Sequence, residues 1–427
     1  MKIVLIALIG ALAAILANGG IAVFNDGLRP IMPEYLEGRM KKAELAATSF
    51  ALSFGLVIGF GIPISIGATI LLVHSILLGT DIIGTWSPKG KIGYAVAGTI
   101  GALWGIGLLV GLQWIVNVFK KLPVNVFNSM GQIGTPVIFA FAAFPALAVA
   151  YQYGVKNGLI TLTISALVRA VVARFSPIVI GTSKIALNPE GMALVTGMIV
   201  LLIYAMRERK EENSTNIAAL FTERVDRIKK NVWVLAIMGA LVAAATSLHI
   251  LAGDPISLSL VSKGNYTDAA LVALARAIGF VPLVATTAIA TGVYGPVGMT
   301  FIFAAALFAN NPLLAAILGF VIIFAEVYLL GGIAAFLDKF PGIKKSSDNI
   351  RTAMGQLLEV ALLVGGANAS NMALPGLGIF IVIGLYLLNE IAGRPIVRMA
   401  VGPIAAILVG ILANILAVFG LYVPPVK

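Results

Sequence analysis

The sequence predicts an all-α polytopic membrane protein, and three observations lead to this fold class. Of the 427 residues, 60% are hydrophobic and only 11% are charged, whereas a soluble domain is usually about half apolar and about a quarter charged. The apolar residues form long runs, and a membrane-spanning helix needs about 20 such residues. The positive charges lie in short segments between the runs, as expected for loops that flank a membrane.

Helices are the expected spanning elements because lipid offers the backbone no hydrogen bonds. Only helices and closed barrels satisfy all backbone groups internally, and barrel strands appear as alternating segments of about ten residues. The runs here are longer and continuous. We therefore expect about 11–14 transmembrane or re-entrant helices.

A charged segment divides the chain almost in half. Residues 207–230 hold seven basic and five acidic residues. We therefore expect an N-terminal membrane repeat at 1–206, a cytoplasmic charged linker at 207–231 and a C-terminal membrane repeat at 232–427.

The two halves contain similar segments. Residues 120–133 read KKLPVNVFNSMGQI and residues 344–357 read KKSSDNIRTAMGQL. The two align without gaps, and six pairs are identical: Lys120 with Lys344, Lys121 with Lys345, Asn125 with Asn349, Met130 with Met354, Gly131 with Gly355 and Gln132 with Gln356. Charged and amide identities are not explained by shared apolar composition, so the sequence predicts two tandem structural repeats.

Two apolar runs at corresponding positions carry glycine and proline in their interior. These are 45–79, with Gly59, Gly61 and Pro63, and 268–293, with Gly279, Pro282 and Gly292. Duplicated transporters often place their substrate site at such discontinuous helices, so we expect broken helices here. The broken runs favour inverted repeats. However, inverted repeats would put one Lys-Lys pair outside, against the positive-inside rule.

Ionisable residues close to apolar runs are costly and are therefore candidate functional groups. Asp26 and Arg29 are three apart, so on a helix they share a face and can pair. The pair is either a gate or an interfacial salt bridge. Asn389, Glu390 and Arg394 form a similar cluster at the end of a later run, where Glu390 and Arg394 are four apart and can also pair.

Arg394 has a repeat counterpart in Arg169, and a guanidinium at mid-membrane would suit a carboxylate, phosphate or phosphonate. The alternative is a structural ion pair. Glu359 and Glu326 lie in apolar surroundings and could carry a proton in transport, or could be hydrogen-bonded packing residues.

Amides and hydroxyls complete the set of candidate substrate-binding residues. Besides Arg169 and Arg394, these are Gln132, Thr135, Thr286, Thr287, Gln356, Asn368 and Asn371. Thr135 is the repeat counterpart of Glu359. The threonines could offer hydroxyls to Na⁺ or a substrate, or could bond to their own helix. The asparagines lie in a Gly/Asn-rich segment that we expect to be a break in a helix.

Several function classes are excluded or unsupported. The chain has no cysteine, so disulfides and thiolate–metal sites are absent, and the isolated His74 and His249 predict no metal site. No Walker A, H-E-x-x-H or G-x-S-x-G motif occurs, so we expect neither ATP-driven transport nor an enzyme. The formal charge of +11 is explained by basic loops and does not predict nucleic-acid binding.

Several segments together resemble the YhfT family of bacterial inner-membrane proteins. They are 22–31 (AVFNDGLRPI), 279–288 (GFVPLVATTA), 347–351 (SDNIR), 359–365 (EVALLVG), 388–390 (LNE) and 393–395 (GRP). The similarity extends over nearly the whole chain. It implies a multi-pass bacterial membrane protein with a role in transport, and it carries over no catalytic or binding residue.

The combined prediction is a secondary-active transporter of a small polar, anionic metabolite across the bacterial cytoplasmic membrane. We expect an elevator-like movement in a homodimer, no cofactor, and coupling to H⁺ or Na⁺. Three alternatives remain open: a phosphotransferase-type permease that works with soluble partners, an intramembrane enzyme and a passive channel.

Overall fold

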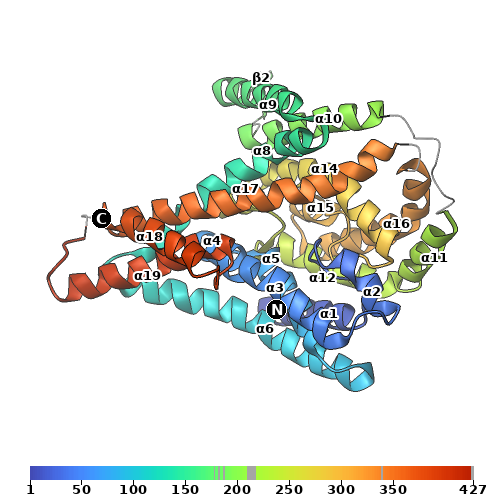
Figure 1. Ribbon diagram of the computed structural model, residues 1–427, viewed down its shortest axis with the longest axis horizontal. Coiled ribbons are helices and arrows are strands. Elements are labelled where there is room, and N and C mark those ends of the chain that lie inside the picture. Colours follow the sequence, from blue (N-terminus) through green and yellow to red (C-terminus); the bar gives the residue numbers. More distant parts are fainter. Residues whose placement is uncertain (177, 181–182, 186–187, 209–217, 338–339, 425–427) are drawn as a thin grey trace.

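The computed structural model describes residues 1–427 apart from 177, 181–182, 186–187, 209–217, 338–339 and 425–427 (Figure 1). Its N-terminal half contains α1 (Lys2–Asn18), η1 (Arg29–Ile31), α2 (Met32–Leu36), α3 (Lys42–Leu56), η2 (Val57–Gly61), α4 (Ile62–Ala68), β1 (Leu71–Leu72), α5 (Val73–Trp86), α6 (Gly90–Lys121), α7 (Val126–Gly131), α8 (Gly134–Tyr153), α9 (Val155–Phe175), β2 (Ile178–Ile180), β3 (Ser183–Ile185) and α10 (Pro189–Arg207). The C-terminal half contains α11 (Ala218–Lys229), α12 (Val232–Ser247), β4 (Leu251–Ala252), α13 (Pro255–Ser262), α14 (Tyr266–Thr291), α15 (Phe301–Ala309), α16 (Pro312–Leu337), α17 (Pro341–Ala373), α18 (Leu377–Ile391) and α19 (Arg398–Val418).

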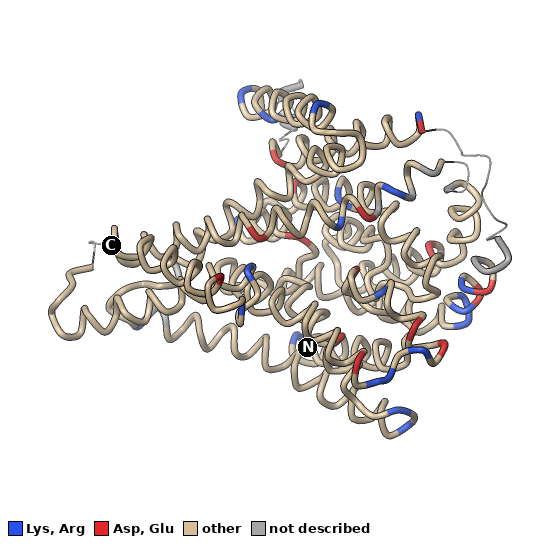
Figure 2. The backbone as a smooth tube through the Cα atoms, viewed as in Figure 1, with Lys and Arg blue, Asp and Glu red and all other residues tan. Residues whose placement is uncertain are grey.

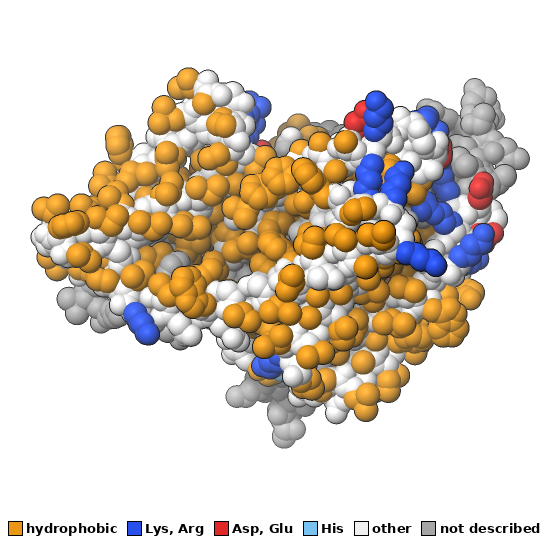
Figure 3. All heavy atoms as spheres, turned by 90° about the horizontal axis from the view of Figure 1, so that it is seen from below, with side chains coloured by type: hydrophobic (Ala, Val, Ile, Leu, Met, Phe, Trp, Pro, Cys, Tyr) orange, Lys and Arg blue, Asp and Glu red, His pale blue; other side chains and the backbone are white. Residues whose placement is uncertain are grey.

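The chain is an all-α, multi-pass membrane protein. Within the described residues, nine helices are long and apolar enough to cross a membrane, with α3 to α4 counted as one span, and a tenth arises if the bent pair α11–α12 is one span. Two more apolar helices, α1 and α18, are shorter. Large hydrophobic side chains are exposed along the outer helices (Figure 3), as expected where lipid replaces water.

The helices pack into two bundles. The first bundle consists of α1–α6 and α12–α16, and the second bundle consists of α7–α10 and α17–α19. In Figure 1, α9 and α10 at the top and α18 and α19 at the left belong to the second bundle, whereas α1, α12 and α16 belong to the first. The bundles meet mainly where α14 contacts α10 and α17, where α19 contacts η2, and where α7 contacts α4.

Two short pairs of extended backbone segments, which we call the crossings, lie inside the first bundle. Strand β1 pairs in parallel with β4, Leu71 lying opposite Leu251. Ala22, in the segment after α1, forms a parallel bridge with Tyr294, in the segment between α14 and α15. Non-helical backbone within a membrane protein must find partners in the protein, and the crossings supply them. They also fix the segments at 22–29 and 295–300 next to each other.

Two expected helix breaks are not observed. The run at 268–293 forms one helix, α14, which passes through Pro282 and ends at Thr291. Asn368 and Asn371 lie on the last turns of α17, which continues to Ala373, rather than in a loop. By contrast, the run at 45–79 contains the π-helical turn η2 between α3 and α4, followed by β1 and α5.

Charged residues gather at one end of the molecule, which carries α2 and α11 (Figures 2 and 3). Arg224 of α11 pairs with Glu37 at 3.6 Å, and Arg227 donates to the carbonyl of Gly20 at 2.9 Å. Lys89 lies over the ring of Tyr35. The segment after α2, the α5–α6 connection and helix α11 therefore share this end, which we call the charged end.

Candidate functional site

A cavity of about 440 Å³ lies between the two bundles. The first bundle contributes the segment after α1, η2, α5, α14 and the segment before α15. The second bundle contributes Phe141 of α8, the stretch from Arg351 to Leu358 of α17, and Met399 of α19. The cavity wall is mostly apolar. Among the described residues that line it, the charged ones are Asp26, Arg29, Arg276 and Arg351.

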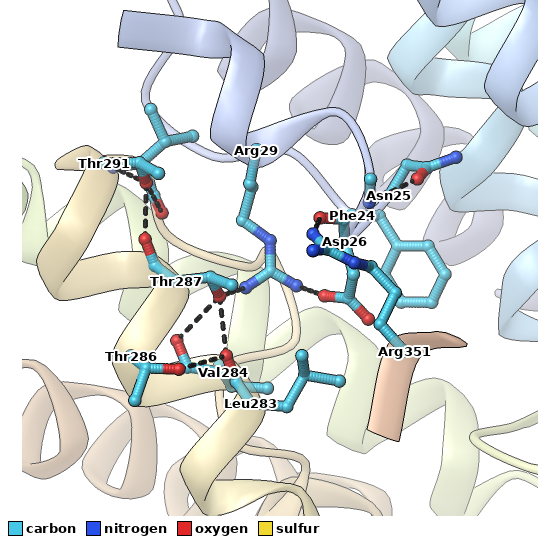
Figure 4. A network of polar contacts seen from close by, with 12 residues as sticks. Phe24, Asn25, Asp26, Arg29, Leu283, Val284, Thr286, Thr287, Thr291 and Arg351 are labelled. Atoms are coloured by element: carbon cyan, nitrogen blue, oxygen red, sulfur yellow. Dashed lines mark hydrogen bonds and ion pairs between the residues drawn. The ribbon is translucent and has the colours of Figure 1, made fainter. Parts of the chain in front are cut away.

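Arg29 is held at the cavity by two partners. Its side chain is only 3% exposed and forms an ion pair with Asp26, so the pairing that the spacing allows is observed. Its other terminal nitrogen donates to the hydroxyl of Thr287 on α14 at 2.8 Å. Figure 4 shows the guanidinium lying between these two groups. One gating candidate and one substrate-binding candidate are thus in direct contact.

The segment that carries Asp26 and Arg29 is fixed by a buried carboxylate. Asp81 of α5 accepts hydrogen bonds from the backbone N–H groups of Phe24 at 3.0 Å and Asn25 at 2.7 Å. The side chain of Asn25 donates to the hydroxyl of Ser53 at 3.0 Å. Sequence reasoning missed Asp81, although it is the only acidic residue within helix α5 and stands alone in an apolar stretch.

Arg351 reaches the same place from the second bundle. It donates to the backbone carbonyl of Asp26 at 3.3 Å and pairs with Asp348 one turn before it. Figure 4 shows Arg351 approaching Asp26 from the side opposite Arg29. The contact links α17 directly to the segment after α1, so it spans the boundary between the bundles.

Arg276 is the second group that sequence reasoning missed. It lies on α14, lines the cavity, and is 5% exposed. Its guanidinium lies 4.9 Å from the ring centre of Phe280. Within the described part of the chain, no carboxylate lies within 4.0 Å of it, and its Nε has no hydrogen-bond partner. The feature of the sequence that could have identified Arg276 is its position in the middle of an apolar run.

Two neutral groups at the cavity also have spare hydrogen-bonding capacity. His74 lies edge-on to Phe24 and Phe60 at about 5 Å, and its Nδ1 has no partner in the described residues. Thr300 precedes α15 with φ of 76°, and its buried hydroxyl is likewise unpartnered among them. A β-branched residue in this backbone region is an outlier that marks local strain.

Glu326 of α16 lies behind the cavity wall. Tyr294 donates to its Oε2 at 2.7 Å, and the N–H of Met299 donates at 2.9 Å. Its Oε1 has no partner within the described structure. A Cβ on Gly298, which lines the cavity, would lie 2.2 Å from Oε2. Glu326 therefore holds the segment before α15 in place.

Glu359 and the cluster at the end of α18 lie elsewhere, in the second bundle. Glu359 pairs with Arg398 at 3.4 Å, and Arg398 also pairs with Glu390 at 2.7 Å. Arg394 pairs with Glu390 at 3.0 Å and is 55% exposed. Asn389 exchanges two hydrogen bonds with the backbone of Ile396 and so closes this turn.

Arg169, the repeat counterpart of Arg394, pairs with Glu190 at 2.8 Å and lies over the ring of Phe139. Neither arginine lines the cavity. Each has its own carboxylate, so the structure does not bring the two together.

Of the remaining candidates, the two threonines of α14 bond to the backbone of their own helix. Thr286 donates to the carbonyl of Pro282 at 2.6 Å, and Thr287 donates to that of Leu283 at 2.7 Å, so both hydroxyl protons are used by their own helix.

The amide candidates and Thr135 lie outside the cavity. Gln132, Thr135, Gln356 and Asn368 are exposed on the second bundle, and Asn371 accepts a hydrogen bond from Gly376 at 2.9 Å. Tyr151 donates to Gln356.

Comparison with known proteins gives one family. The sequence model of the YhfT family, described as a protein of unknown function, matches residues 2–422. The curated Uncharacterized protein YhfT of Escherichia coli (strain K12) is 38% identical over 441 residues, which cover 99% of each of the two chains. No solved structure matches the chain.

Proposed function

The chain belongs to the YhfT family, and on that premise we propose that it is a secondary-active transporter of a small anionic metabolite in the bacterial cytoplasmic membrane. The observation that carries the proposal is the position of the cavity. It lies between two separately packed bundles and is lined by residues of both. Movement of one bundle against the other would expose such a cavity to each side in turn.

The packing pattern supports a duplicated architecture. Helix α1 packs against α5 and α6, and α12 packs in the same way against α15 and α16. Likewise, α8 and α10 pack against α9, and α17 and α19 pack against α18. The segment after α1 pairs with the segment before α15, and the segment after α12 pairs with the segment before α5. The two crossings therefore join corresponding parts of the two halves.

These correspondences give seven membrane elements in each half. They are α1, α3–α4, α5, α6, α8, α9 and α10 in one half, and α12, α14, α15, α16, α17, α18 and α19 in the other. If each of these elements crosses the membrane once, the odd number per half gives the two halves opposite orientations. We therefore favour inverted repeats, an arrangement typical of alternating-access transporters.

The distribution of polar groups supports an elevator-like mechanism. The buried Arg29 and Arg276 and the partly buried Asp26 belong to the first bundle, which would carry the substrate. The second bundle contributes mainly apolar residues and Arg351 to the cavity, and would serve as the scaffold.

A cross-link between the bundles tests this proposal. A Cβ on Gly55 of α3 would lie 3.1 Å from the Cβ of Val397 before α19, and would meet atoms of Val397 alone among its three nearest. This is close to the separation of about 3.5–4.5 Å in disulfides. Because the chain has no cysteine, the variant Gly55→Cys/Val397→Cys would form one defined bond.

The matched control lies within the second bundle. A Cβ on Gly410 of α19 would lie 3.4 Å from the Cβ of Val126 of α7, and again meets atoms of that valine alone. Both variants are reconstituted in liposomes, and uptake of radiolabelled carboxylates and phosphates is measured before and after oxidation.

We expect saturable uptake that oxidation abolishes in Gly55→Cys/Val397→Cys, that a reductant restores, and that the control pair retains. Full uptake by the oxidised cross-bundle variant would contradict alternating access. Non-saturable conductance would indicate a channel, and uptake only in the presence of soluble phosphoryl-carrying partners would indicate the permease alternative.

A further inference from the structure

We infer that the cavity binds an organic monoanion with an apolar body, and that Arg276 is the partner of its carboxylate. The inference gives the proposed transport function a substrate class. Binding itself is independent of transport, so the two can fail separately.

Among the described residues, one of the cations around the cavity has no carboxylate partner. Of the three arginines that line it, Arg29 pairs with Asp26 and Arg351 pairs with Asp348. Arg276 has no carboxylate within 4.0 Å among the described residues. Burying a charge without a countercharge is costly, so a bound anion would stabilise this arrangement.

The buried Asp254 is a candidate for the countercharge within the protein. It influences Arg276 electrostatically, but it is not a lining residue of the cavity. One of its oxygens caps α13 by accepting from the N–H of Ser257 at 2.8 Å. Asp254 thus serves the start of α13, whereas Arg276 lies at the cavity wall.

The apolar side chains that line the cavity with Arg276 determine which kind of ligand body can accompany the carboxylate. Phe24, Phe60, Phe141 and Phe280 line the cavity together with several aliphatic side chains. A sugar or a hydrated inorganic anion would lose hydrogen bonds to water against these walls. An aromatic or branched apolar body would instead bury its surface there, and a volume of about 440 Å³ is within the range of small-molecule sites.

Two further groups would orient the carboxylate. The hydroxyl of Thr300 and Nδ1 of His74 are at the cavity and have no partner in the described structure. Hydrogen bonds to a charged carboxylate are stronger than neutral ones. A ligand that accepts them would satisfy polar atoms that the protein leaves unpaired.

The test uses the purified full-length protein with benzoate, 3-phenylpropionate and isovalerate as probes. Benzamide is the neutral analogue of benzoate, and inorganic phosphate is the hydrated anion. Binding is measured by calorimetry on the wild type, on Arg276→Gln and on Arg276→Lys. The control is Arg169→Gln, which removes an arginine that lies outside the cavity.

We expect at least one apolar carboxylate to bind, with benzamide and phosphate weaker by about tenfold or more. Arg276→Gln should lose that preference for the carboxylate, Arg276→Lys should retain part of it, and Arg169→Gln should bind as the wild type does. Unchanged carboxylate binding by Arg276→Gln, equal binding of benzamide, tighter binding of phosphate, or no binding of any of the three carboxylates would each overturn the inference. Carboxylate binding without uptake in liposomes would leave this site standing and contradict the transport proposal.

Discussion

Arg29 and Thr287 are 258 positions apart in the chain, yet the guanidinium donates a 2.8 Å hydrogen bond to the hydroxyl. The contact joins the segment after α1 in the first half to α14 in the second half (Figure 4). Since Arg29 is almost fully buried, this acceptor and Asp26 replace water at its terminal nitrogens, whereas its Nε has no hydrogen-bond partner in the described structure.

Thr287→Val should therefore destabilise the protein by about 1–3 kcal/mol, the usual cost of leaving a buried charged donor without its acceptor. Thr286→Val is the matched control, because the hydroxyl of Thr286 bonds only to carbonyls of its own helix in the described structure. Thermal unfolding followed by tryptophan fluorescence would compare the two. Equal melting temperatures would show that the contact with Arg29 adds nothing.

Gly298→Ala should disturb the segment that leads into α15. Gly298 has φ of 56°, and an added Cβ would lie 2.2 Å from Oε2 of Glu326, so strain and a clash combine. We expect a loss of about 1–3 kcal/mol or more.

Gly295→Ala is the control for this change, since its Cβ would have no atom nearer than 3.7 Å. Both melting temperatures are measured in the same detergent. A Gly298→Ala protein as stable as Gly295→Ala would contradict the described backbone of this segment.

Glu326 is our candidate for the proton-coupling residue. The sequence alone left this role open between Glu326 and Glu359. Glu359 already pairs with Arg398, whereas one oxygen of Glu326 has no partner in the described residues. Glu326→Gln keeps the shape but cannot release a proton. We expect the variant to lose uptake driven by a proton gradient and to retain exchange of substrate across the liposome membrane.

Glu359→Gln should retain gradient-driven uptake. If Glu326→Gln accumulates substrate like the wild type in response to a proton gradient, then Glu326 is not the coupling residue.

The charged end should face the cytoplasm, because basic residues favour that side. Lys91 lies at this end, in the first turn of α6. Lys263 lies just before α14, and the far end of α14 accepts a hydrogen bond from Arg224 of α11. A helix of 26 residues spans about 39 Å, so the two lysines lie on opposite sides of the membrane.

Lys263→Cys should react with a membrane-impermeant maleimide in spheroplasts, and Lys91→Cys should react only after permeabilisation. Both side chains are exposed in the structure. The reverse labelling pattern would show that the protein has the opposite orientation.

Local sequence patterns predicted those features of the structure that depend on residues close together in the chain. Hydropathy gave the helical membrane fold, and spacings of three and four predicted the pairing of Asp26 with Arg29 and of Glu390 with Arg394, both of which are observed. Neither pair lies on a single helix, because Asp26 is in the turn before η1 and Arg394 follows the end of α18 with φ of 65°. The short spacing brings the side chains together through turns instead.

The cavity depends on contacts that no local pattern contains. Arg276 has no oppositely charged residue three or four positions away, and its position at the cavity follows from how α14 meets α10 and α17. The glycines and prolines also misled in part, because α14 tolerates Pro282 in its interior. Arg394 illustrates the converse, since an arginine that looked buried in the sequence is exposed beside its own carboxylate.

Access to the cavity from both sides of the membrane is the central claim, and one cysteine tests it. Gly355 lines the cavity, and a Cβ there would have no neighbouring atom within 4 Å, so Gly355→Cys places a single thiol in open space. Labelling with an impermeant maleimide is measured in right-side-out and inside-out vesicles. We predict labelling from both sides, reduced to one side when Gly55→Cys/Val397→Cys is cross-linked beforehand. Labelling of Gly355→Cys from one side only, with or without the cross-link, would contradict alternating access.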